Sequence, residues 1–166
     1  MEKRAYGVEE FLSRPKTLEE EIRGDIDHIA SLRSIVEKNT TQLSFTAGRN
    51  PSKNEKAFEN VMIQIAEEEQ RLEAKQKLLV GLKMEVENLI NHIPEADQQK
   101  FLRLKYLNGM DMIAIRGIIG LSKSSIYRLH EKALRTASSI FTQMGLAETA
   151  WDKTGKNISD SIMIAK

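Results

Sequence analysis

Apolar residues recur at alternating spacings of three and four along two long stretches of the chain, and both stretches predict amphipathic helices. In the first stretch the stripe also contains the polar residues Asp25 and Asn39, which are candidates for fixing the register or the oligomeric state. Thr17 and Glu20 match a capping box, so we expect this helix to run from about Thr17 to Leu43. The apolar members of its stripe are Leu18, Ile22, Ile29, Leu32, Val36 and Leu43.

The second stretch has the cleaner pattern, and only Glu68 and Lys75 interrupt it. Its apolar members share one heptad register: Phe58, Val61, Ile65, Leu72, Leu79, Leu82, Val86, Leu89 and Ile93. Such a long run favours a coiled-coil seam over an ordinary amphipathic helix. Thr46–Asn54, a loop rich in Gly, Pro and Asn, separates the two stretches and allows an antiparallel hairpin. We also expect a homo-oligomer formed through this helical hairpin.

Both ends of the hairpin carry further segments. Residues 1–16 include apolar side chains before Pro15 and predict a short separate helix that packs on the hairpin. Pro94 ends the second long helix, because proline cannot continue a helix and restricts the residue before it. Residues 146–166 form a tail, which is either flexible or holds a short amphipathic segment near Trp151.

Between Pro94 and Gly145 the pattern changes to short helices. A first helix opens near Pro94 with Asp97 in its first turn and closes at Asn108–Gly109, and a second runs from Asp111 to Ile119. Gly120 can take the positive φ of a sharp turn, after which Leu121 returns to the core and Ser122 caps the next helix.

The helix that begins at Ser122 separates an apolar face from a polar one. Ile126, Leu129, Ala133 and Leu134 make the inner face. A helix whose N-terminal half enters the major groove needs hydroxyl groups and cations on its outer face. The candidate DNA-binding residues are Lys123, Ser124, Ser125, Tyr127, Arg128 and Lys132.

The distribution of charge supports a nucleic-acid interface in this segment. The net charge of the chain is +1, yet residues 1–93 sum to −3 and residues 94–145 sum to +4. Aromatic residues make up only 5% of the chain, which favours helices over sheets. We therefore predict an all-α protein with a long antiparallel helical hairpin (coiled coil) over 1–93, a small helix-turn-helix DNA-binding domain over 94–145 and a C-terminal tail over 146–166.

Several classes of function are not expected. The chain has no cysteine, its three histidines are scattered, and it shows no Gly-rich phosphate loop or nucleophile elbow. We therefore expect no enzyme, no catalytic residues, no cofactor and no metal site. Without a signal peptide or an apolar run long enough to span a membrane, the chain is expected to be cytoplasmic, in a bacterial host, with no membrane partner.

The same segment carries a resemblance to known families. Residues Ile113–Leu134 resemble the helix-turn-helix of sigma-factor region 4, with Gly120-Leu-Ser122 at the turn and Ala133-Leu134 near the end. With Phe101–Gly109 included, the whole chain resembles phage-encoded proteins of the DUF1492 type, which are similar to the ArpU and RinA groups of phage transcriptional regulators. The resemblance implies a regulator of phage or prophage transcription, often of late genes.

One position departs from the sigma-like pattern. Arg116 lies four residues before Gly120, where such motifs usually place alanine for close helix packing. Either the register slips by one to Gly117, or the packing is looser, or the stem of Arg116 directs its charge outward.

We expect a sequence-specific regulator that binds double-stranded DNA. The alternatives are an accessory factor that binds bacterial RNA polymerase, a small DNA-packaging protein and a structural coiled-coil adaptor.

Overall fold

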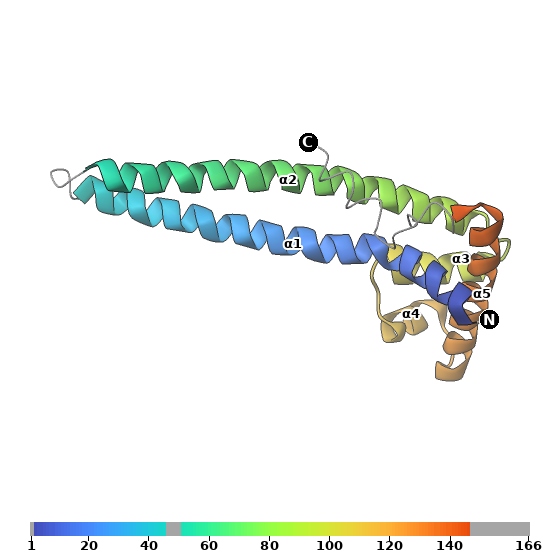
Figure 1. The fold of residues 1–166 in the computed structure, drawn as a ribbon. Helices are drawn as coiled ribbons and strands as arrows, with labels where there is room; N and C mark the ends of the chain where they lie inside the picture. The colour runs from blue at the N-terminus through green and yellow to red at the C-terminus, as the bar shows by residue number, and fades with distance from the viewer. Residues whose placement is uncertain (1, 46–50, 147–166) are drawn as a thin grey trace. The chain divides into compact units, whose positions relative to one another are not determined.

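The computed structural model describes residues 2–45 and 51–146, and these ranges contain helices and turns without any strand (Figure 1). This confirms the predicted all-α class. The elements are α1 (Glu2–Phe45), α2 (Pro51–Asn91), α3 (Ala96–Leu102), the π-helical turn η1 (Arg103–Leu107), α4 (Met112–Ile119) and α5 (Lys123–Gln143). The tail beyond residue 146 lies outside the described residues.

The first long helix does not begin at Thr17. Helix α1 runs without interruption from Glu2 to Phe45 and contains Pro15. The predicted cap at Thr17 and the predicted separate helix over residues 1–16 are therefore wrong. Proline removes one backbone hydrogen bond from a helix interior. Here Pro15 is itself buried, with buried apolar residues on both sides of it, so packing offsets the loss of that hydrogen bond.

Helices α1 and α2 pack together as a hairpin, as the two apolar stripes predict. Ile29 and Leu32 from α1 form a buried cluster with Ile65 from α2, and Val36, Val61 and Leu72 pack around it. Helix α2 begins at Pro51, so residues 51–54 are helical rather than part of the predicted loop. Proline is favourable at the first position of a helix, where its missing N–H is not needed.

Two of the four polar residues that interrupt the stripes, Asp25 and Lys75, meet across the hairpin. Lys75 Nζ lies 2.8 Å from Asp25 Oδ2 and 3.6 Å from Glu21 Oε2. The hydrogen bond to Asp25 raises the pKa of Lys75 above its usual value. Asp25 is therefore paired between the two helices, while its role in fixing register or oligomeric state stays a prediction.

The chain forms two compact units. The hairpin unit is Thr17–Val80, and the terminal unit combines Met1–Lys16 with Gly81–Lys166. The functional division into 1–93, 94–145 and 146–166 stays a prediction. Residues from both ends of the chain build the core of the terminal unit: Val8, Phe11, Leu12, Val86, Leu89, Ile90, Ile93, Phe101, Leu102, Tyr106, Ile115, Ile126, Ala133, Ala137 and Phe141.

The short helices follow the predicted order with one local difference. Helix α3 passes directly into η1, where the N–H of Asn108 donates to the carbonyl of Arg103 at 3.0 Å, a five-residue step. The segment ends at Asn108 and Gly109, whose φ of 67° is left-handed. In the ranges described, no helix combines the length and apolar character that crossing a membrane requires.

Candidate nucleic-acid interface

Helix α4 and helix α5 are joined by a tight turn at Gly120. The φ of Gly120 is 77°, and its N–H donates to the carbonyl of Arg116 at 2.9 Å. A left-handed residue at this position closes a helix and redirects the chain. Asp111 caps the start of α4, since its Oδ1 accepts from the N–H of Ala114 at 2.8 Å. Both expectations for this two-helix unit, the positive φ and the range of α4, are confirmed.

Ser122 caps helix α5 as predicted. Its Oγ accepts from the N–H of Ser125 at 3.3 Å and donates to Ser125 Oγ at 2.9 Å. Ser124 Oγ lies 3.3 Å from the same hydroxyl. The three hydroxyl groups therefore form a local network at the N-terminus of the helix, where the first backbone N–H groups also point outward.

The inner face of α5 holds the helix in the terminal unit. Ile126 and Ala133 are buried, whereas Leu129 and Leu134 are half-buried and pack against the same core. The helix continues beyond the predicted segment to Gln143, and its extra turns bury Ala137 and Phe141. The ring of Phe141 lies 5.1 Å from that of Phe11 in α1. The inner face of α5 thus rests on the apolar core of the terminal unit.

The predicted DNA-binding residues lie away from that core. Ser125 is half-buried and belongs to the cap, while five of the set are exposed: Lys123, Ser124, Tyr127, Arg128 and Lys132. In the part of the chain that the structure describes, the three cations among them make no ion pair. Arg103 and Arg135, by contrast, are paired with Glu87 and Glu131. The unpaired cations keep their charge available for an anionic partner.

Arg116 adds a fourth unpaired cation to this region. It is exposed on α4, as is its neighbour Gly117, while Ile115 is fully buried and makes the contact with the core. Arg116 is therefore not the packing position, and neither is Gly117, the residue to which a slip of one was expected to move it. The sequence pattern placed Arg116 one residue from the true packing position, so its availability to a ligand was missed.

One titratable group of α5 faces inward instead. His130 Nε2 lies 3.2 Å from Tyr106 Oη, and that hydroxyl also donates to Glu9 Oε1 at 3.4 Å. Burial lowers the pKa of His130 and Lys105 lowers it further, although Glu9 opposes the shift. Burial also raises the pKa of Tyr106 above its usual value. His130 therefore supports the core rather than the outer face.

Two large apolar side chains are exposed on α4. Ile113 is 76% exposed and Ile118 is 49% exposed, and Tyr127 on α5 is 52% exposed. These side chains can contact thymine methyl groups, sugars or another protein. Among the described residues, no cluster of His, Cys, Asp or Glu has the geometry to hold a metal ion.

Comparison with known proteins gives one match. The model of the family described as "Protein of unknown function (DUF1492)" matches residues 45–138, a range that includes α2, the two-helix unit and most of α5. No curated protein and no solved structure matches the chain. Because the matched range exceeds half of the sequence, the chain belongs to the DUF1492 family.

Proposed function

We propose that this protein is a sequence-specific DNA-binding regulator of transcription, acting on phage or prophage genes, often late genes. One observation carries the proposal. The N-terminal half of α5 presents unpaired cations and hydroxyl groups directly after a left-handed glycine turn, opposite a buried apolar face. A helix of this kind can enter the major groove and bind both base edges and phosphates.

The chemistry of the exposed residues supports double-stranded DNA as the ligand. Arg128 carries a planar guanidinium that can donate two parallel hydrogen bonds to guanine, and Lys123 supplies a point charge for phosphate. Arg116 on α4 adds a further charge beside the turn. The resemblance of residues 113–134 to sigma-factor region 4, and of the chain to the ArpU and RinA regulators, supports a role in transcription.

The hairpin supports action as a homo-oligomer. A two-fold pair of chains brings two α5 helices to one DNA molecule and requires a pseudo-palindromic site with half-sites separated by whole helical turns. We propose that the chains associate through α1 and α2, whose outer faces carry exposed apolar side chains.

Selection of bound fragments from a random pool of duplex DNA, with the purified full chain, tests the proposed function. A regulator recovers a defined motif, and the symmetry of that motif reports the number of reading helices. Recovery of random sequences at low salt, with binding lost at physiological salt, contradicts sequence-specific recognition.

A second candidate function is contact with bacterial RNA polymerase through the sigma-like segment. The exposure of Ile113 and Ile118 favours it, because exposed apolar side chains on one short helix suit a protein contact. An accessory factor would reach specific DNA only when polymerase is present. A sequence-specific regulator selects its DNA motif in the absence of polymerase.

A further inference from the structure

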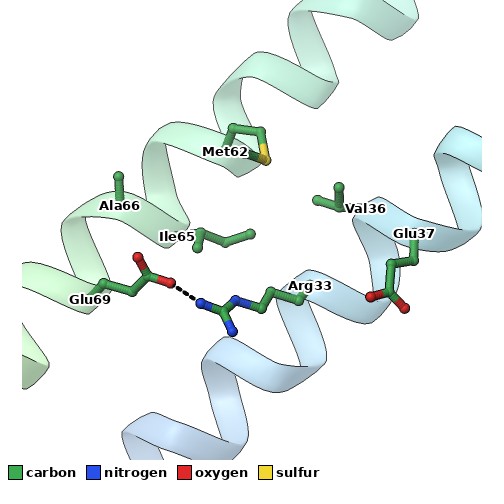
Figure 2. Close-up of a pocket in the computed structure, with 7 residues that line it drawn as sticks. All are labelled: Arg33, Val36, Glu37, Met62, Ile65, Ala66 and Glu69. Carbon is green, nitrogen blue, oxygen red and sulfur yellow. Dashed lines mark hydrogen bonds and ion pairs between the residues drawn. The ribbon is translucent and has the colours of Figure 1, made fainter.

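The hairpin unit has a hollow on one side of its seam. Seven residues line it, four from α2 and three from α1: Arg33, Val36, Glu37, Met62, Ile65, Ala66 and Glu69 (Figure 2). Its volume is about 410 Å³. Ile65 lies at its base, Met62 borders it, and the ion pair between Arg33 and Glu69 crosses between the two helices. The lining is therefore apolar at the centre with charges at its edge.

Helical spacing extends this surface along both helices. Steps of three and four from Arg33 lead to Ala30, Ile26 and Arg23 on α1, and the same steps from Glu69 lead to Glu73 on α2. Ile26 is 47% exposed and Met62 is 45% exposed. Ala30 and Ala66 are also exposed, and their small side chains allow another helix to approach closely. We call these two rows, with the hollow between them, the hollow face.

The two rows of the hollow face have opposite net charge. The α1 side contains Arg23 and Arg33 with one acid, Glu37 of the hollow lining, and from Met62 to Glu73 the α2 row contains two glutamates and no base. The surface is thus complementary to itself rather than to a polyanion. Closed dimers use one self-complementary patch from each chain.

We propose that the hollow face binds the hollow face of a second copy of this chain, which gives an antiparallel four-helix bundle. With the two-fold axis along the hairpin, the α1 row of each copy lies on the α2 row of the other. Arg33, which pairs with Glu69 of its own chain, then also faces the partner's Glu69. The exposed Ile26 and Met62 become covered. The proposal rests on the proposed association through the hairpin and names the surface responsible.

Charge-reversal mixing of full-length chains tests this arrangement. Arg33→Glu alone and Glu69→Arg alone each break the pair within the chain and place like charges across the proposed interface. Each variant is expected to dimerise at least about tenfold more weakly than the wild type in sedimentation equilibrium. When the two variants are mixed, the mixed dimer restores only the contacts between chains. It should therefore exceed both homodimers in native mass spectrometry, with one variant labelled with ¹⁵N.

A matched pair of charge-reversal variants outside the hollow face provides the control. Lys38→Glu and Glu67→Lys also reverse exposed charges on α1 and α2, but they lie off the hollow face. Their mixture is expected to give the statistical distribution of dimers. Far-ultraviolet circular dichroism and thermal melting show whether each variant folds. The double variant Arg33→Glu/Glu69→Arg restores opposite charges both within the chain and across the interface, so it should dimerise more strongly than either single variant.

The possible outcomes distinguish dimerisation through the hollow face from the more general proposal that the chains associate through α1 and α2. A wild-type dimer without preference for the mixed species overturns the hollow face and leaves association by another surface of the hairpin. A wild-type chain that is monomeric at every concentration overturns both. Neither result bears on DNA recovered in the selection experiment.

Discussion

Asp25 and Lys75 lie on different helices of the hairpin, and their side chains meet with Oδ2 and Nζ 2.8 Å apart. Each is one of two polar residues in the apolar stripe of its own helix, at a position where a hydrophobic side chain would favour packing. The ion pair between them compensates the two charges at one level of the hairpin. We expect a shifted register to separate the two charges, so that the pair favours this alignment of α1 on α2.

Single and double replacement of this pair should have opposite effects. Asp25→Leu removes the nearer of the two carboxylates that pair with Lys75 and should lower the free energy of unfolding by about 1–2 kcal/mol. Replacement of both residues by leucine should be neutral or stabilising, while it relaxes the alignment of the helices. Chemical denaturation measures both effects. The exposed pair Glu73–Lys77 is the control, and its removal should change stability very little.

The same pair predicts a dependence on pH at the alkaline end. Because the pKa of Lys75 is raised in the folded state, its contribution to stability is complete below the ordinary value of 10.5 and is lost as the pH rises through the folded pKa. The wild type should therefore lose more stability than the double leucine variant above pH 10.5. If the free energy of unfolding fell equally with pH in the wild type and in the double leucine variant, Lys75 would not be the group responsible.

Replacement of Lys123 or Arg128 by alanine should weaken DNA binding without loss of helicity. Loss of a lysine that contacts phosphate lowers the slope of log affinity against log salt by about one, and loss of an arginine that reads a base costs about 1–3 kcal/mol and relaxes specificity. Gel-shift titration at several salt concentrations measures both. Lys38→Ala in the hairpin is the control. Unchanged binding by both interface variants would place the DNA site elsewhere.

Replacement of Gly120, the left-handed residue in the turn before α5, should lower the free energy of unfolding. Gly120→Ala forces a side chain onto a φ of 77°, and because no atom lies within 4 Å of the new Cβ, the cost of about 1–2 kcal/mol is conformational. Gly117→Ala is the matched control, since it is equally open but helical, and it should stabilise the fold by about 1 kcal/mol. If Gly120→Ala and Gly117→Ala shifted the melting temperature in the same direction, the left-handed conformation of Gly120 would be contradicted.

Gln98 should be a point of weakness in the terminal unit. Its side chain is buried, with 1% exposed, and neither amide atom has a hydrogen-bond partner in the described part of the chain. Gln98→Met keeps the length and removes the polar atoms, so it should raise the free energy of unfolding by about 1 kcal/mol. Gln98→Glu should lower it. A methionine variant that melts below the wild type would indicate that a bound water satisfies the amide.

Local patterns were enough to predict much of this structure. The two apolar stripes predicted the hairpin, and Gly120 and Ser122 predicted the turn and the start of α5, because each signal depends on residues close in sequence. The unpaired cations of α5 were also visible as an outer face. That they make no ion pair among the described residues could be seen only in the structure, since it depends on where the described carboxylates lie.

The misses arose where distant contacts override local preference. Pro15 predicts a helix end by its own chemistry, whereas in the structure it is fully buried and α1 continues through it. The π-helical turn at Arg103–Leu107 has no signature in the spacing of apolar residues. Arg116 was placed by analogy with a motif, whereas Ile115 is the residue that fits the core.

The contact between Phe11 and Phe141 bears on the order in which the chain can fold. During synthesis the hairpin unit can form once residue 80 is available, since the unit consists of residues 17–80. The terminal unit must wait until Phe141 has been made, because residues from the first turns of α1 complete its core. Its closure then spans most of the chain, a step that costs loop entropy before it gains burial. Formation of the hairpin unit can therefore precede the packing of α5 in the terminal unit.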